Sequence, residues 1–428
     1  MFFAHSYGWT GWPVIVGCAL AAVLARPSIL QRSAVSLDAA IVLALAGIAA
    51  QLIPLAPAAR ERVTPAAVAL ERQLFVEAPD APRPSAPLSV DPPATAMAVA
   101  LCTAMALAFW SARTALHRGG IRHLARALGT IALVVTPLAV VHHLNLLAGL
   151  DILWPSTRRD LRPWGPFVNR NDFAGWLLLV LGVTLGYLVT RLQATHRASE
   201  PLDPDRAFDE RGTRIFAAVG VTAGGIMLSL SRSGLLGLAV ALATFVVAGH
   251  RRLESGRLRR LTLALAAVVV GAVVFANLGA LSARVGAAAS EGLAGRLSVW
   301  RQTWPIVRDF WPVGTGIGGY SRAMSAYQTS IRLITIAHAD NEALQILAEG
   351  GALVGVPAAL VVIFTIGLIG RRLREDRTPI FWIRAGAASG LLGIAAQNMV
   401  EMTLRTPATG LLVAVVAAVA AHEPLRVR

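Results

Sequence analysis

The sequence contains no lysine, only two cysteines and few charged residues. Charged residues make up 15% of the 428 residues and hydrophobic residues 55%, which leaves too little polar surface for a soluble enzyme of this length. The 39 basic residues, all arginines, give a net charge of +15. They lie between apolar runs and form no continuous basic stripe, which argues against nucleic-acid binding. Cys18 and Cys102 both fall inside apolar runs, so we expect neither a disulfide nor a metal site.

Long apolar runs dominate the chain. A helix needs about 20 apolar residues to cross the hydrocarbon core of a bilayer, and eleven runs approach or exceed this length. They lie near residues 9–25, 36–56, 93–112, 124–150, 172–190, 213–230, 233–249, 261–283, 343–370, 382–400 and 406–422. The first run lacks a basic n-region and a clear cleavage site, so we expect a retained span. The sequence therefore predicts an all-α, polytopic membrane bundle of about eleven or twelve transmembrane helices.

The arginines indicate which connections between the runs face the cytoplasm. Every second connection is rich in them, with Arg26 and Arg32, then Arg113, Arg118, Arg122 and Arg126, then Arg191, Arg197, Arg206, Arg211 and Arg214, then Arg251, Arg252, Arg257, Arg259 and Arg260, then Arg371, Arg372, Arg374, Arg377 and Arg384. The positive-inside rule makes these connections cytoplasmic. The periplasmic side then carries two long loops, 57–92 and 284–341, and a medium loop, 151–171. We expect a bacterial inner-membrane protein whose C-terminus lies in the cytoplasm.

The loop 57–92 is rich in proline. It contains Pro79, Pro82, Pro84, Pro87 and Pro92, followed by Pro93. Such composition is typical of an extended, mobile segment. We divide the chain into an N-terminal transmembrane region, residues 1–150, which includes this loop, and a catalytic membrane region, residues 151–428, which includes the loop 284–341.

Several arginines lie on the outer face, where the insertion bias disfavours them. Among them are Arg170, Arg232, Arg296 and Arg301. A guanidinium group binds phosphate oxygens in a planar, bidentate way and is not neutralised by deprotonation. A diphosphate held at the membrane surface would need several such groups. The alternative is that these side chains extend from the bilayer edge and contact lipid phosphates.

Two of these arginines belong to motifs at the start of a span. Arg170 lies in Asn169-Arg170-Asn171-Asp172. Asn171 or Asp172 can cap the new helix, whose free N–H groups and dipole suit an anion, but capping explains neither Asn169 nor Arg170. Arg232 lies in a Ser-Arg-Ser turn between two runs, and a charged residue held at the membrane boundary is a functional candidate.

The large outer loop holds a predicted helix and a glycine-rich segment. Arg296, Trp300 and Thr303 share one face of the helix, and its tryptophans suit a helix that lies in the membrane interface. Gly316 belongs to the segment Gly-Thr-Gly-Ile-Gly-Gly. Segments of this kind can bring backbone N–H groups against phosphate.

The outer loop enters the next run through His338, Asp340 and Asn341. His338 or Asp340 can act as a general base on a hydroxyl nucleophile. Asp340 or Asn341 can equally serve only as the N-cap of the helix that follows. The spacing alone leaves both interpretations open.

Taken in this order, the segments resemble the O-antigen ligase and polymerase superfamily. Its members carry an Asn-rich motif at the start of a mid-chain span, a Ser-Arg turn and an Arg-x-x-x-Trp helix, followed by a Gly-x-Gly segment and a His-Asn segment in the large periplasmic loop. The resemblance covers about residues 160–370. It implies a membrane glycosyltransferase with a GT-C-like helical fold and short helices in the periplasmic loop. It also implies a glycan donor on a polyprenyl diphosphate, usually undecaprenyl, with no metal or other cofactor.

The motifs and the resemblance together assign the candidate site. The diphosphate-binding residues are Arg170, Arg232, Arg296 and Arg301, and the supporting residues are Asn169, Asn171, Asn341 and Gly316. The base is His338 or Asp340, because the family histidine often stands directly before the asparagine, where this chain has Asp340. We favour His338.

The sequence leaves the identity of the glycan acceptor open. A ligase gives the glycan to lipid A-core or to a protein serine, whereas a polymerase gives it to another lipid-linked repeat unit, as in O-antigen or exopolysaccharide synthesis. The motifs do not separate these, and we lean to the ligase. A transporter of lipid-linked sugars is disfavoured, because transporters place ionisable residues at mid-membrane, whereas His142, His143 and Glu401 fall near the outer ends of runs.

Overall fold

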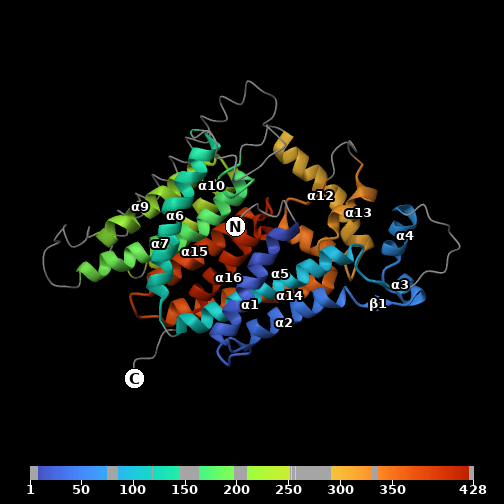
Figure 1. Ribbon diagram of the computed structural model, residues 1–428, viewed down its shortest axis with the longest axis horizontal. Helices are drawn as coiled ribbons and strands as arrows, with labels where there is room; N and C mark the ends of the chain where they lie inside the picture. Colours follow the sequence, from blue (N-terminus) through green and yellow to red (C-terminus); the bar gives the residue numbers. More distant parts are fainter. Residues whose placement is uncertain are drawn as a thin grey trace.

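The computed structural model describes residues 8–74, 85–117, 119–144, 146, 163–196, 210–250, 252, 256, 291–329 and 336–423. These residues form an elongated bundle of helices with one short two-stranded sheet (Figure 1). The expected all-α architecture is confirmed for this part of the chain.

The elements follow one another along the chain in three groups. The first group is α1 (Trp12–Ala25), α2 (Val35–Ala50), β1 (Pro54–Leu55), α3 (Pro57–Val63), α4 (Pro65–Leu74), β2 (Ala86–Pro87), α5 (Pro92–His117) and α6 (Ile121–His143). The second is α7 (Arg170–His196), α9 (Glu210–Leu228), α10 (Arg232–Gly249), α12 (Glu291–Asp309) and α13 (Tyr320–Tyr327). The third is α14 (Glu342–Glu375), α15 (Phe381–Gln397) and α16 (Pro407–Ala421), and short 3-10 turns span Gly8–Gly11 and Thr403–Arg405.

The apolar runs of the sequence correspond to helices. Among the described residues, five helices are long and apolar enough to cross a bilayer, namely α5, α6, α7, α10 and α14, and α1, α2 and α16 are shorter apolar helices. Each run coincides with a helix except 261–283, which lies outside the described residues. The chain is therefore a multi-pass helical membrane protein, and the total number of spans stays a prediction.

Helix α7 lies at the centre of the bundle. Its spanning window is 94% buried, and α15, α9, α6 and α10 pack around it. A Cβ atom at Gly182 would lie 2.3 Å from the carbonyl oxygen of Gly386, and one at Gly186 would lie 2.2 Å from that of Trp382. These glycines therefore set the spacing between α7 and α15, as small residues do where transmembrane helices pack closely.

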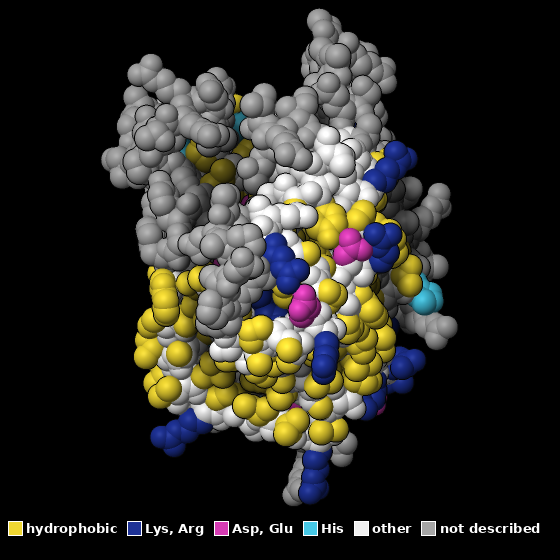
Figure 2. Space-filling view, turned by 90° about the vertical axis from the view of Figure 1, so that its right-hand side faces the viewer, with side chains coloured by type: hydrophobic (Ala, Val, Ile, Leu, Met, Phe, Trp, Pro, Cys, Tyr) yellow, Lys and Arg dark blue, Asp and Glu magenta, His cyan; other side chains and the backbone are white. Residues whose placement is uncertain are grey.

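The outer surface of the bundle is apolar where lipid is expected. Val23 and Leu24 of α1 are 71% and 82% exposed, and Val362 and Ile363 of α14 are also exposed. In Figure 2, hydrophobic side chains cover much of the lower half of the face viewed, whereas arginine and acidic side chains lie in its middle and at its edges. An exposed apolar surface of this extent is expected for a protein embedded in a bilayer.

The loop 284–341 contains the expected short helices. In its described part, α12 and α13 pack with α4 around a small apolar core that includes Ile306, Phe310, Tyr320 and Met324. These helices lie together at one end of the bundle (Figure 1). This end is the outer end in the orientation predicted from the arginines.

The segment 57–92 differs from its prediction. We expected extended, mobile chain, but residues 57–74 form α3 and α4, and β1 pairs with β2 in an antiparallel register. Pro57 and Pro65 each stand in the first turn of a helix, where the missing N–H has no intrahelical partner to lose. The prediction is therefore wrong for residues 57–74, and residues 75–84 lie outside the described residues.

Helix α14 is broken near its start. Gly351 has φ 53° and ψ −146°, which is not helical, and a Cβ atom there would lie 2.2 Å from the carbonyl oxygen of Pro312. The break lets the glycine-rich segment pass against α14, where the N–H of Gly316 donates to the carbonyl oxygen of Glu349 at 2.9 Å. The outer helices are thereby joined to the membrane bundle.

Candidate functional site

The connection between α15 and α16, residues 398–406, joins the starts of other helices. The carbonyl oxygen of Asn398 accepts a hydrogen bond from the N–H of Glu342, the first residue of α14, at 3.0 Å. At the end of α15, the Gln397 amide donates to the carbonyl oxygen of Asn171, in the first turn of α7, at 2.8 Å. The starts of α7 and α14 therefore meet at this connection.

Glu401 lies within this connection and is the centre of the candidate site. Its side chain is 8% exposed and forms an ion pair with Arg296 of α12, 105 residues away in the sequence. The side chains of Asn171 and Ser233 also hydrogen-bond to Glu401. Burial raises the pKa of the Glu401 carboxyl, and the charge of Arg296 acts in the opposite direction. Three helices, α7, α10 and α12, therefore converge on one carboxyl group.

The starts of α7 and α10 also contact each other directly. The Ser231 hydroxyl donates to the side-chain oxygen of Asn171 at 2.7 Å and caps α10 by accepting a backbone N–H. Arg170 directly precedes Asn171, and Arg232 directly follows Ser231. Both arginine side chains are exposed, and within the described residues neither forms an ion pair. Two of the predicted arginines therefore flank the contacts to Glu401, and the third makes one of them.

Asn169 organises the turn that leads into α7. Its side-chain oxygen accepts the N–H of Asn171 at 2.9 Å, a local bond typical of an asparagine in a turn. Asp172, one residue further, interacts with Thr406 and with Glu401. The Asn-rich motif is therefore partly a helix-start motif and partly a contact to the 398–406 connection.

The segment before α14 is held in one conformation. The N–H of Ala339 donates to the Gln345 side chain at 2.7 Å, and its carbonyl oxygen accepts the indole N–H of Trp300 at 2.8 Å. Asp340 has a φ of 50°, a left-handed conformation that is uncommon for residues other than glycine. Asn341 caps α14 by accepting a backbone N–H of its first turn at 3.0 Å. The capping role thus belongs to Asn341, and Asp340 is left without it.

Asp340 lies in the field of two cationic groups. Burial raises the pKa of its carboxyl, and the charges of Arg296 and His338 lower it. Asp340 in turn raises the pKa of Glu401. His338 is exposed, so it can be reached from outside. His338, Asp340, Arg296 and Glu401 therefore form one electrostatic unit.

A second group of ion pairs joins the 398–406 connection to the start of α14. Arg405 contacts Glu342 at 3.2 Å and Glu349 at 2.8 Å. Burial disfavours the charge on Arg405, but the two carboxylates outweigh this effect and raise its pKa. Glu349 also accepts the amide of Gln345 at 2.9 Å. Because Gln345 holds the N–H of Ala339, this cluster fixes the segment that carries His338 and Asp340.

Two predicted residues lie apart from the site. Gly316 has φ 90°, and a Cβ atom there would lie 2.1 Å from the hydroxyl oxygen of Ser89. Because its N–H already bonds to Glu349, Gly316 serves the packing of the loop against the bundle. Arg301 lies on the exposed face of α12, whereas Arg296 points to Glu401.

The sequence analysis did not assign Glu401, Ser233 or Gln397 to the site. Glu401 is an acidic residue in a short connection between two apolar runs, which is a weak signal of function. Its partner Arg296 is too distant in the sequence for any spacing rule to join them. Ser233 follows Arg232 in the same motif, but only the fold shows that it faces Glu401.

Comparison with known families gives a match within the second half of the chain. Residues 217–358 match the family model described as O-antigen ligase. This region begins within α9 and ends within α14, and it contains Arg232, Arg296, His338 and Asp340. No curated protein matches the chain, and no solved structure matches it.

Proposed function

We propose that this chain, whose residues 217–358 match the O-antigen ligase family model, transfers a glycan from a polyprenyl diphosphate carrier to an acceptor hydroxyl. The cluster around Glu401 is the site that we assign to this reaction. The acceptor that we favour is lipid A-core, as for a ligase. Joining of lipid-linked repeat units by a polymerase is the alternative.

One observation supports this assignment above the others. Arg296 forms an ion pair with Glu401, and its charge acts on Asp340. Arg170 is next to Asn171, which contacts Glu401 and Ser231. Arg232 lies between Ser231 and Ser233, and Ser233 also contacts Glu401. One cation thus lies beside a candidate base, and two more from other parts of the sequence adjoin the residues that contact its carboxylate partner. A diphosphate and an attacking hydroxyl need this combination in one place.

The proposed reaction uses these groups as follows. The acceptor hydroxyl oxygen attacks the anomeric carbon of the lipid-linked sugar, and the bond from that carbon to the diphosphate oxygen breaks. The departing diphosphate keeps the electron pair and gains negative charge, which the arginines stabilise more in the transition state than in the ground state. One well-placed donor of this kind contributes about 3 kcal/mol. The acceptor proton passes to His338 or Asp340, and a base in this position contributes about 10²–10⁴-fold.

The site carries positive charge from its arginines and from two helix starts, and one of these arginines, Arg296, is paired with Glu401. The starts of α7 and α10 add the positive ends of their helix dipoles. Arg170 and Arg232 carry no carboxylate partner within the described residues. The site therefore keeps a net attraction for an anion.

The membrane places the donor. A polyprenyl tail in the bilayer confines the diphosphate to the membrane surface, which restricts its search to two dimensions and aligns it. We propose that this surface is the periplasmic face of the inner membrane, because the arginine-rich connections lie at the other ends of the helices. The energy of transfer then comes from the diphosphate bond of the donor.

A transfer assay with purified components tests this function. Full-length protein in detergent is mixed with an undecaprenyl diphosphate glycan and either lipid A-core or a second lipid-linked unit, and product is followed by mass. We expect product with wild type and none with Arg232→Ala or His338→Ala, both exposed positions whose substitution leaves folding intact. Arg211→Ala, an exposed arginine on α9, is the matched control and stays active.

The same assay identifies the acceptor of the glycan and the residue that acts as the base. Product on lipid A-core assigns a ligase, and product on the second lipid-linked unit assigns a polymerase. A larger loss with His338→Ala than with Asp340→Asn assigns His338 as the base. Full activity in both Arg232→Ala and His338→Ala would refute the site, and no product with either acceptor would refute the function.

A further inference from the structure

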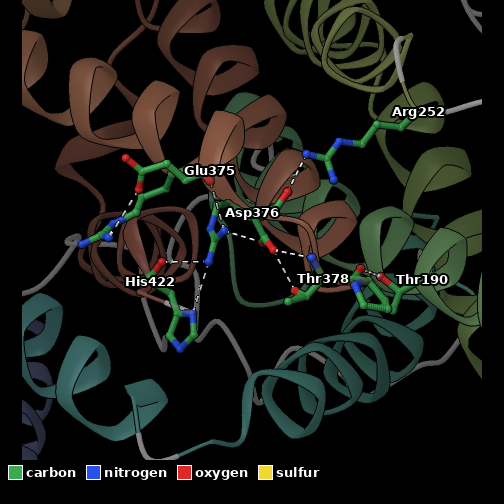
Figure 3. Close-up of polar contacts among 9 residues, drawn as sticks. Thr190, Arg252, Glu375, Asp376, Thr378 and His422 are labelled. Carbon is green, nitrogen blue, oxygen red and sulfur yellow. Dashed lines mark hydrogen bonds and ion pairs between the residues drawn. The ribbon is translucent and has the colours of Figure 1, made fainter. Parts of the chain in front are cut away.

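A second polar region lies at the end of the bundle opposite the candidate site. Helix α14 begins at the site and ends here after 34 residues, which is roughly 50 Å of helix. A buried ion pair joins Asp376, which follows α14, to Arg384 of α15. Arg384 also donates to the carbonyl oxygen of His422 at 2.8 Å, and Arg252 donates to that of Asp376. Figure 3 shows Asp376 between His422 on one side and Thr378 on the other.

A cavity of about 350 Å³ adjoins this network. Its polar lining is Gln31, Arg32 and Ser33 from the α1–α2 connection, Arg113 and His117 from the end of α5, Arg372 from α14, and Glu423. The lining therefore comes from the ends of several helices that the buried ion pairs hold together. No residue of the candidate site takes part in it.

An anionic group already occupies the position that an anion would take in this cavity. The carboxylate of Glu423 lies 3.3 Å from the Arg372 guanidinium and hydrogen-bonds to the Ser33 hydroxyl. Arg372 and Ser33 are thus arranged to hold an oxyanion. A phosphate in place of the Glu423 carboxylate would meet the same donors.

Two of the three lining arginines already have carboxylate partners. Arg113 is neutralised by Asp38, with 2.8 Å contacts to both carboxylate oxygens, and Arg372 lies 3.3 Å from Glu423 and 4.0 Å from Glu375. Arg32 forms no ion pair within the described residues. Its guanidinium therefore remains for a ligand in a cavity that already holds a carboxylate.

The α1–α2 connection, which supplies Arg32 and Ser33 to the cavity, also exposes apolar side chains. Leu24 is 82% exposed, and Ile29, Leu30 and Val35 are 46%, 54% and 47% exposed. All four belong to this connection or to the helix ends beside it. A free phosphate ion gains nothing from these side chains, whereas a lipid can lay its acyl chains along them while its headgroup enters the cavity.

We propose that this cavity binds the headgroup phosphate of an anionic phospholipid from the leaflet opposite the candidate site. The phosphate displaces the Glu423 carboxylate from Arg372 and Ser33 and also contacts Arg32, while His117 donates a hydrogen bond. The acyl chains cover the exposed apolar side chains of the α1–α2 connection. Loss of one charge-assisted contact weakens the binding about tenfold. A bound lipid would then help to hold the ends of α5, α14 and α16 together.

The test uses the purified full-length protein in neutral detergent. The midpoint of thermal unfolding is titrated with dihexanoyl phosphatidylglycerol, dihexanoyl phosphatidylcholine and inorganic phosphate at constant ionic strength. The variants are Arg32→Gln and, as matched control, Arg26→Gln, because Arg26 is an exposed arginine of the same connection that does not line the cavity. Ser33→Ala, which removes only a hydroxyl, gives a second variant if Arg32→Gln fails to fold.

We expect phosphatidylglycerol alone to raise the midpoint of wild type and of Arg26→Gln. In Arg32→Gln the concentration needed for half the effect rises about tenfold, and in Ser33→Ala it rises by a smaller factor. An equal response to phosphatidylcholine or to inorganic phosphate would overturn the proposal. Equal responses of wild type, Arg32→Gln and Ser33→Ala would overturn it as well.

Discussion

At the scale of single residues, the ion pair between Arg296 and Glu401 determines the shape of the site. An arginine on an outer helix would otherwise sample many rotamers, and fixing it on donor binding would cost free energy. The buried Glu401 carboxyl holds the guanidinium in place beforehand, and the side chains of Asn171 and Ser233 hold Glu401. Preorganisation of this kind is what a diphosphate site needs.

Substitution of Glu401 tests this role. Glu401→Gln keeps the size of the side chain and removes its charge, so Arg296 loses its anchor, and we expect kcat/KM for the donor to fall about 10–100-fold. Because Glu401 and Arg296 act as a unit, we expect kcat/KM of the double variant with Arg296→Gln to be no lower than that of the less active single variant. Glu210→Gln, which breaks an exposed ion pair on α9, is the control and leaves the rate unchanged. Additive losses would show that Glu401 acts independently of Arg296.

Single-residue motifs indicated part of the candidate site. Arg232, Arg296 and His338 were selected because each stands in a local pattern that a sequence displays. Glu401 was not selected, because its contact with Arg296 spans 105 residues. Asn341 was recognised as a possible cap, and Gly316 was given a supporting role in a glycine-rich segment, where its N–H bonds to the carbonyl oxygen of Glu349. Local patterns show which residue types are present, and only packing shows where each side chain points.

At the scale of elements, the close packing of α7 against α15 holds the start of α7 and the end of α15 in register with the site. Gly182→Val places a branched side chain where even a Cβ atom would lie 2.3 Å from a carbonyl oxygen. We expect a loss of about 1–3 kcal/mol or more in stability, measured as a lower unfolding midpoint in detergent. Gly367→Val in α14, where no atom lies within 4 Å of the added Cβ, is the matched control. Equal midpoints for the two variants would contradict this role of Gly182.

The end of α16 gives a pH dependence. Burial, with Arg384 nearby, lowers the pKa of His422 from its ordinary value of 6.5 to about 4. Between these values the unfolded chain binds a proton that the folded chain does not, so stability falls as the pH drops from about 6.5 to about 4. We expect His422→Gln to lose less stability over this range, by comparison of unfolding midpoints at pH 7 and pH 5. His123→Gln, at an exposed position of α6, should keep the dependence of wild type, and an unchanged slope in His422→Gln would contradict the assignment.

The helices themselves were largely predictable, because a run of about 20 apolar residues has few alternatives in a bilayer. The exception is instructive. The prolines between Pro79 and Pro93 suggested extended chain for the whole segment 57–92, yet Pro57 and Pro65 begin helices. Proline excludes a helix interior and favours a helix start, so the same residue type indicates opposite structures according to its position.

At the scale of the whole molecule, the account requires the candidate site and the arginine-rich connections to lie on opposite sides of the membrane. In a background of Cys18→Ala and Cys102→Ala, Arg301→Cys reports the outer face and Arg122→Cys the inner face; both positions are exposed. We expect an impermeant maleimide to label Arg301→Cys in intact cells and Arg122→Cys only after the membrane is opened. The reverse pattern would place the site in the cytoplasm.

Diphosphate recognition is tested by the affinity of the purified protein for undecaprenyl diphosphate compared with undecaprenyl monophosphate. We expect wild type to prefer the diphosphate about tenfold or more, as expected for one further charge-assisted contact. We expect Arg170→Gln, Arg232→Gln and Arg296→Gln each to lose most of this preference, and Arg301→Gln, on the exposed face of α12, to lose less. Equal affinity for the two lipids, or a preference that survives all three substitutions, would contradict diphosphate recognition at this site.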